Sequence, residues 1–342
     1  MKRKVYLILL LGIIALTGRA QIGGEYTYQF LELTNSARIA ALGGTQVAVS
    51  DSLDLNLPYH NPSLLHREMS NRVLVNYVNY LADINYGYAS YAQSYEGIGN
   101  FAVGMHYINY GKFEEALETG ELTGATFKAA EYALNLIYSN SYQRLSYGVN
   151  LKPIFSSFES YQSFGIAADL GLNFSSKSKF TTVGIVARNF GTQISTYYQD
   201  GKREKIPFNL EMGISQRLQH APLVFSATLQ HLTQWDLASP AEEPDFSTET
   251  IYEYDEKFMK QFMRHLVFGV EFLPSENFIL RAGYNYQRRQ ELKFEEKAST
   301  VGFSAGFGLR IKRFRLDYGI SRFHLAGSSN LFSLSINLND NL

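Results

Sequence analysis

The sequence predicts an all-β protein: a transmembrane antiparallel β-barrel of about fourteen strands with an N-terminal plug segment. Three observations lead to this prediction: apolar and polar residues alternate over strand lengths, the composition is rich in aromatics and poor in charge, and short connections alternate with long ones. The clearest stretch is residues 301–320, where Phe303 and Phe307 alternate with Ser304 and Arg310. Because successive strand side chains point to opposite faces, this pattern predicts a hairpin with one apolar and one polar face.

The composition favours a membrane barrel over a soluble or helical membrane protein. Aromatic residues make up 14% of the 342 positions, with 24 Tyr and 24 Phe, and charged residues only 18%, below the usual quarter. Aromatic girdles and a lipid-facing band account for both values. A formal charge of -1 gives no basic footprint for nucleic acid, and the absence of cysteine excludes disulfides, thiolate metal sites and a lipoprotein anchor.

Residues 1–20 are predicted to be a signal peptide. Lys2, Arg3 and Lys4 precede an apolar run at 5–16, and a small-residue site places cleavage before Gln21. The apolar run is shorter than the roughly twenty residues that span a bilayer. Because later stretches are also too short or too polar to be spanning helices, a membrane form of the mature chain has to be a closed barrel.

Residues 21–71 differ from the rest and are predicted to form the plug. A short helix is expected after Asn35 or Ser36, which can cap it, and before Gly43-Gly44, which can end it. The segment is too small to fold alone and too apolar for a disordered linker. We therefore expect it to pack inside the lumen of the barrel.

Residues 72–342 are predicted to form the barrel. An even number of antiparallel strands is typical of single-chain outer-membrane barrels. The expected strands are 72–80, 84–95, 98–110, 127–142, 145–154, 163–175, 181–190, 206–219, 223–234, 265–272, 278–287, 299–311, 314–321 and 331–339.

The connections between these strands predict the orientation. Outer-membrane barrels have short periplasmic turns and longer surface loops, so alternation of length places the long connections at the cell surface and the protein in the outer membrane. Tight turns are expected at 96–97, 143–144, 176–179, 220–222, 274–277 and 312–313. Long loops are expected at 111–126, 155–162, 191–205, 235–264, 288–298 and 322–330.

Charged residues also occur on the expected inner faces. Both signs are present, so we expect ion pairs between wall and plug; the selectivity filter of a porin is the alternative. The expected lumen charges are Lys152, Asp169, Arg188, Glu211, Arg281, Arg310, Arg315 and Asp317.

No pattern for catalysis or cofactor binding stands out. None of the seven histidines has zinc-protease spacing, and the long acidic connection at 235–264 lacks EF-hand spacing. A hydrolase would need an accessible Ser/His pair, for which His106 and His231 are the candidates. A hydrogen-bonded barrel histidine is the simpler interpretation, so we expect no enzyme activity, no cofactor and no metal.

Several short motifs together resemble a known family. They are Phe30-Leu31-Glu32-Leu33, Ser36-Ala37-Arg38, Ala40-Ala41-Leu42-Gly43-Gly44, Asn61-Pro62, Asn76-Tyr77-Val78-Asn79-Tyr80, Tyr107-Ile108-Asn109-Tyr110-Gly111-Lys112-Phe113 and Leu151-Lys152-Pro153-Ile154. In combination, and across the whole mature chain, they resemble the PorV/PorQ family of outer-membrane components of the type IX secretion system, which is related to FadL-like fatty-acid channels.

The resemblance implies a non-enzymatic barrel that anchors a PorZ-like surface protein, within an attachment complex that also holds PorU-like and PorV-like proteins. A FadL-like channel for hydrophobic small molecules is the alternative. The residues assigned to the plug are Ser36, Arg38, Gly43, Gly44, Asn61 and Pro62. The candidate aromatic anchors for a partner, on the long loops, are Phe113, Trp235, Phe246, Tyr252, Tyr254 and Phe258.

Overall fold

The computed structural model is a closed antiparallel barrel of fourteen strands, which confirms the predicted fold class. It describes residues 26–80, 84–117, 119, 121–198, 201–237, 258–291, 300–324 and 327–339. The first strand pairs with the last, with Arg72 opposite Asn337, so the sheet has no free edge. Within the described residues we find no helix that is long and apolar enough to cross a bilayer. The predicted signal peptide, residues 1–20, lies outside the described residues.

Each strand pairs with its neighbours in sequence, apart from the closing pair of β1 and β14. The strands are β1 (Arg72–Asn79), β2 (Asn85–Tyr95), β3 (Gly99–Ala116), β4 (Leu122–Tyr142), β5 (Leu145–Phe158), β6 (Tyr161–Ser175), β7 (Thr181–Ser195), β8 (Asn209–Arg217), β9 (Leu223–Leu229), β10 (Leu266–Phe272), β11 (Phe278–Asn285), β12 (Phe303–Ile311), β13 (Phe314–His324) and β14 (Gly327–Asn337).

The outer face of the barrel is apolar. Along β6, for example, Leu170 and Leu172 are exposed, while Asp169 and Asn173, which flank them in the sequence, are buried in the lumen. The same alternation continues around the sheet, with exposed Phe225 on β9. Water would penalise such a continuous apolar exterior, whereas lipid matches it.

The predicted alternation of short and long connections is correct for the tight-turn rim and, on the other rim, for the long connections after β7, β9 and β11. On the other rim β5 and β6 are joined by residues 159–160 alone, and β13 and β14 by 325–326, so the long loops expected at 155–162 and 322–330 are wrong. The expected loop at 111–126 is mostly the paired ends of β3 and β4. Ladder hydrogen bonds satisfy the backbone groups of these polar stretches, which therefore continue as strands.

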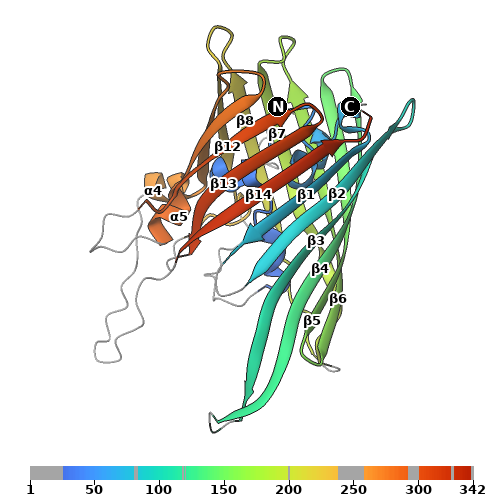
Figure 1. Ribbon diagram of the computed structural model, residues 1–342, viewed down its shortest axis with the longest axis vertical. Helices are drawn as coiled ribbons and strands as arrows, with labels where there is room; N and C mark the ends of the chain where they lie inside the picture. The colour runs from blue at the N-terminus through green and yellow to red at the C-terminus, as the bar shows by residue number, and fades with distance from the viewer. Residues whose placement is uncertain are drawn as a thin grey trace, which may run out of the picture.

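The barrel wall is lopsided as a result. Strands β3 and β4 have 18 and 21 residues, whereas β9 and β10 have 7 each. The β3–β4 hairpin projects far beyond the rim opposite the tight turns (Figure 1). Next to the short strands, on the same side, lie two helices, α4 (Phe258–Arg264) and α5 (Tyr286–Glu291).

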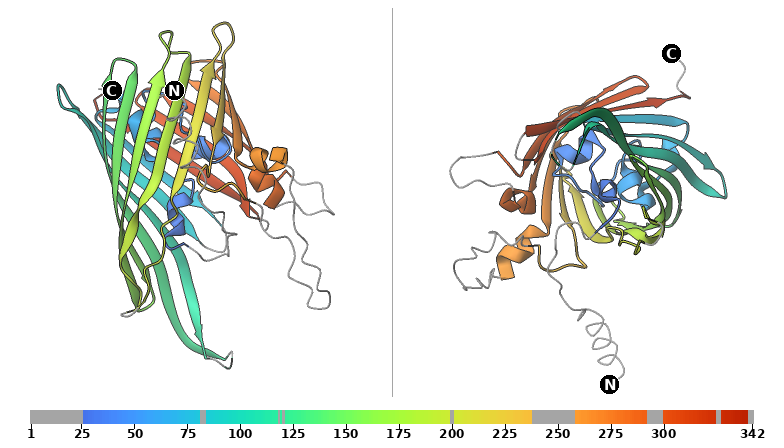
Figure 2. Two further views of the ribbon diagram at one scale, coloured as in Figure 1. Left: turned by 180° about the vertical axis from the view of Figure 1, so that it is seen from behind. Right: turned by 90° about the horizontal axis from the view of Figure 1, so that it is seen from below.

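The N-terminal segment lies inside the barrel, surrounded by the strands (Figure 2). It contains η1 (Gln29–Glu32), α2 (Ala37–Ala41), α3 (Leu57–His60), η2 (Pro62–Leu64) and η3 (Arg67–Met69). Ser36 caps α2 by accepting a hydrogen bond from the Ile39 amide, and Gly43 and Gly44 follow the helix with φ of 104°, a conformation that favours glycine. Apolar plug residues such as Phe30 and Leu31 are buried against wall residues, which makes the plug part of the barrel core.

Gly302 is the one inner-face glycine of the 301–320 hairpin that differs from expectation. It precedes β12 and has a positive φ of 87°, so it belongs to the connection after α5. Gly306 and Gly308 do lie in β12, and Gly306 faces Ala41 of the plug. The turn at Lys312-Arg313 joins β12 to β13 on the tight-turn rim.

Candidate functional site: the plugged lumen and the loop-side rim

An ion-pair cluster joins the plug to the barrel wall. Arg38 of α2 lies 3.0 Å from Asp51 and 2.8 Å from Asp54, both in the plug, and 2.7 Å from Glu271 of β10. Arg315 of β13 approaches the same two plug carboxylates, at 2.9 Å from Asp51 and 3.1 Å from Asp54. The plug therefore contacts two distant strands through buried charges.

The same cluster continues along the wall. Arg281 lies 2.8 Å from Glu271 and 2.6 Å from Asp317, and Arg315 lies 2.8 Å from Asp317. Arg310 adds a contact of 2.7 Å to Asp51. Four arginines and four carboxylates thus form one charge-balanced network across plug, β10, β11, β12 and β13.

The electrostatics of the plug carboxylates follow from this geometry. Burial alone would raise the pKa of Asp51, but Arg315, Arg38 and Arg310 outweigh it and hold this pKa well below its usual range. Asp51 therefore stays ionised at neutral pH. A buried ion pair is costly to break because the remaining charge loses its partner in a place that water cannot reach.

A second group of buried charges lies on the opposite wall. Lys152 of β5 is 2.7 Å from Asp169 of β6, with both side chains fully buried, and Lys152 donates to Asn189. Arg188 of β7 lies 3.4 Å from Glu211 of β8. All eight charges expected on the inner faces therefore take part in ion pairs: four belong to the network that includes the plug, and the other four form two separate pairs.

The Asn61-Pro62 turn contacts the wall directly. Asn61 accepts a hydrogen bond from the Ser63 amide and donates to the Val47 carbonyl, which holds the plug chain in a compact turn. Gly148 of β5 faces the backbone of Pro62, and a Cβ at Gly148 would overlap it. The absence of a side chain there is what admits the plug.

The two candidate histidines, His106 and His231, lie in different surroundings. His106 is completely buried, and its Nδ1 atom lies 2.8 Å from the Tyr59 hydroxyl of the plug. Its neighbours Phe30 and Tyr86 enclose the ring further. A substrate has no route to this imidazole in the plugged barrel. The backbone amide of His231 donates to the Asn209 side chain.

Two aromatic groups mark the loop-side rim. Phe113, expected in a loop, lies in strand β3 instead and stacks on Phe127 of β4 at 5.2 Å, exposed on the projecting hairpin. Trp235 stacks on Phe258 of α4 at 5.1 Å, and both rings are exposed. The other three candidate anchors, Phe246, Tyr252 and Tyr254, lie outside the described residues.

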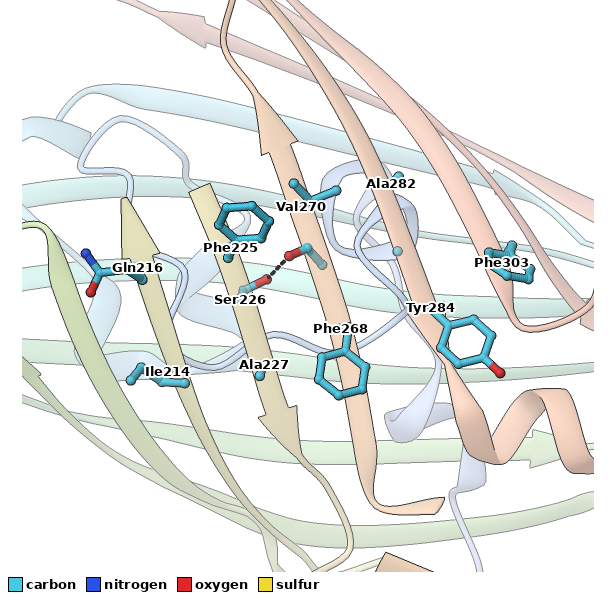
Figure 3. Close-up of a pocket in the computed structure, with 12 residues that line it drawn as sticks. Ile214, Gln216, Phe225, Ser226, Ala227, Phe268, Val270, Ala282, Tyr284 and Phe303 are labelled. Carbon is cyan, nitrogen blue, oxygen red and sulfur yellow. Dashed lines mark hydrogen bonds between the residues drawn. The ribbon is translucent and has the colours of Figure 1, made fainter. Parts of the chain in front are cut away.

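Apolar hollows of about 400 to 600 Å³ lie on the outer wall of the described barrel. One of about 400 Å³ spans β8 to β12, where Phe225, Phe268 and Tyr284 surround the small residues Ala227 and Ala282 (Figure 3). These side chains extend from the face of the strands that points away from the plug. The hollow therefore faces the surroundings of the barrel.

A polar cavity of about 220 Å³ lies in the lumen, between the plug and α5. Glu32, Thr34 and His60 line it from the plug, and Arg188 and Glu211 from the wall. Carboxylate, guanidinium and amide groups dominate its lining.

Similarity to known proteins is limited to the fold. No protein-family model and no curated protein matches the chain. Among solved structures, a deltaS2 mutant of the TodX monoaromatic hydrocarbon channel aligns over 90% of this chain and 98% of its own, with a TM-score of 0.51 and 14% identity. The KdgM porin aligns over 78% and 99%, with a TM-score of 0.33 and 4% identity. The chain thus shares its barrel architecture with the TodX monoaromatic hydrocarbon channel.

Some site residues were not expected from the sequence. Asp51, Asp54 and Glu271 supply three of the four carboxylates of the main network. A signal was present, because Asp51 and Asp54 are the only acidic residues between positions 33 and 67. In a segment expected to enter a lumen lined by several arginines, two isolated carboxylates predict wall contacts.

Proposed function

We propose that this protein is a non-enzymatic outer-membrane barrel that anchors a surface partner, with the role of a PorQ-like component of the type IX secretion system. The observation that carries the proposal is the combination of a plug held by buried ion pairs and a loop-side rim that projects aromatic side chains. A filled barrel offers a rigid support, and exposed aromatic pairs are common centres of protein interfaces. The partner expected from the family resemblance is PorZ-like, within a complex with PorU-like and PorV-like proteins.

The apolar outer face of the barrel supports its position in the membrane. Exposed Leu170, Leu172 and Phe225 belong to an apolar belt that suits the hydrocarbon layer. The tight-turn rim then faces the periplasm, and the β3–β4 hairpin and α4 face the cell surface. This orientation places both aromatic groups where a surface protein can reach them.

The experiment is co-purification from outer membranes of cells that make the protein. Replacing Phe113 and Phe127 together by alanine is expected to reduce recovery of the PorZ-like partner severalfold, because the stacked pair is lost while the hairpin ladder remains. Tyr142→Ala is the matched control, since Tyr142 is an exposed aromatic residue on the tight-turn rim. Equal recovery from the double variant and the control would rule out the β3–β4 hairpin as the docking surface.

A channel for hydrophobic small molecules is the second candidate, and the fold shared with the TodX hydrocarbon channel favours it. The polar lining of the lumen cavity argues against it, since an apolar solute would have to displace water from charged groups. Uptake of toluene into vesicles containing the purified barrel tests this candidate. Uptake that exceeds that of protein-free vesicles, and that is lost when the plug is crosslinked to the wall, would favour the channel over the anchor.

A further inference from the structure

The polar lumen cavity has the features of a binding site that the anchor role does not use. Glu32, Thr34 and His60 line the cavity from the plug, and Gln287 and Arg288 line it from α5. Asn209, the first residue of β8, and His231, just after β9, also line it, so the cavity lies toward the loop side. A small solute from outside the cell would meet it before reaching the ion-pair cluster.

The charges of the lining are not balanced. Three carboxylates, of Glu32, Glu211 and Glu291, face two guanidinium groups, of Arg188 and Arg288. Arg188 lies 3.4 Å from Glu211, and Arg288 donates to the Ser321 hydroxyl.

Glu32 supplies the excess negative charge. Glu211 accepts from Thr45 and Asn209, and Glu291 accepts from Gln287. Among the described residues, Glu32 alone of these three carboxylates has no hydrogen bond or ion pair. Its side chain is accessible from the cavity.

His60 provides a second, independent observation. Its ring is 2% exposed, and neither Nδ1 nor Nε2 has a hydrogen-bond partner within the described part of the chain. Burial and the nearby Arg188 lower the pKa of His60, so the ring is neutral and offers one donor and one acceptor. Buried polar atoms normally have partners, so the unpartnered ring of His60, which belongs to the cavity lining, leaves hydrogen-bonding capacity unused at the cavity wall.

The chemistry of the lining narrows the class of occupant. No group of three or more His, Cys, Asp or Glu side chains within the described residues is arranged to hold a metal ion. No phenyl, phenol or indole ring lines the cavity, so the aromatic cage that binds quaternary ammonium ions is missing there. A carboxylate, an imidazole nitrogen and amide oxygens are hydrogen-bond acceptors, which suit a cation that carries N–H donors.

We propose that this cavity binds a primary ammonium group, held by a charge-assisted hydrogen bond to Glu32 and seated beside the unpartnered ring of His60. The ammonium belongs to a small free amine or to a lysine side chain of a docked chain, since both present the same group. The site rests on the lumen alone, so it stands whether or not the barrel anchors a partner.

The raised pKa of the Glu32 carboxyl group supports an ammonium ligand at this site. The surrounding plug and wall remove part of the water around the Glu32 carboxyl group, which raises its pKa to about 7 although the residue keeps accessible surface; Arg188 opposes this shift and Glu211 adds to it. A carboxylate without a cation partner behaves in this way, and a bound ammonium would lower this pKa again. Amine binding should therefore strengthen as the pH rises from 6 to 8.

Calorimetric titration of the purified full chain in detergent tests the site. The probe is n-butylammonium, with 1-butanol and butyrate as neutral and anionic analogues. Saturable binding is expected for the amine only, and Glu32→Gln should weaken it at least about tenfold, the equivalent of roughly 1.4 kcal/mol. Glu276→Gln, on the exposed turn between β10 and β11, is the matched control and should bind as the unmodified protein does.

Three results would contradict the ammonium site. Unchanged affinity in Glu32→Gln, tighter binding of butyrate, or no saturable heat with the amine would each overturn the proposal. Because Glu32 is accessible, Glu32→Gln should fold like the unmodified protein. Folding is checked by electrophoresis, in which a folded barrel changes its mobility only after heating. Titration with Nα-acetyl-lysine amide separates the two sources, since tighter binding than n-butylammonium indicates a lysine side chain and weaker binding a free amine.

Discussion

Removing Arg38 should release the plug from the wall. Arg38→Ala leaves three carboxylates with fewer cationic partners: Asp51 keeps Arg310 and Arg315, Asp54 keeps Arg315, and Glu271 keeps Arg281. Breaking one buried pair by removing a partner costs about 3–5 kcal/mol. A loss of about 3 kcal/mol raises the fraction of molecules with an undocked plug by at least ~100-fold.

The chain allows a direct measurement of plug opening because it contains no cysteine. Ala48→Cys places a single thiol in the plug at a position that is 1% exposed. The rate of maleimide labelling in lipid vesicles then reports the open fraction. Far-UV circular dichroism on the same samples shows whether the barrel itself stays folded.

Arg67→Ala is the matched control. Arg67 lies 3.5 Å from Glu96 with both side chains exposed, and exposed pairs contribute only about 0–1 kcal/mol. Labelling of the control should therefore match that of the parent. If Arg38→Ala labels no faster than Arg67→Ala, the network does not hold the plug and the anchor proposal loses its structural basis.

Three further changes probe the plug contact, the lipid face and the cavity. Gly148→Ala should destabilise the protein by about 1–3 kcal/mol in urea titrations, since the new methyl group overlaps Pro62; unchanged stability would show that the plug can shift without cost. Leu170→Arg, on the exposed face of β6, should cost about 2–4 kcal/mol in vesicles, whereas Leu122→Arg on the projecting hairpin should cost far less; equal costs would disprove the assigned membrane belt. Because the pKa of Glu32 is raised from 4.5 to about 7 by folding, the free energy of unfolding should fall as the pH rises between these values, and Glu32→Gln should remove that slope. A slope that persists in the amide variant would assign it to another group.

The number of strands and the face of each side chain could be predicted because they depend on a local pattern. Phe307 and Leu316 point outward and Arg315 inward, as a period of two requires. The short plug helix could be predicted because its signals, at Ser36 and Gly43, interrupt that period. Strand ends were harder to predict, because polar stretches such as residues 111–116 can form either a loop or an extended ladder.

What the sequence by itself determined was a closed, aromatic-rich barrel with an N-terminal segment too small to stand alone. Only the tertiary structure decided that Arg38 pairs with Glu271, 233 residues away, and that Glu32 and His60 meet Arg188 and Glu211 around one cavity. The physical reason is the distance along the sequence over which each interaction acts. Alternation and capping act between neighbours in the chain, whereas charge pairing and cavity shape depend on which strand lies opposite which part of the plug, and that is set only when the barrel closes around it.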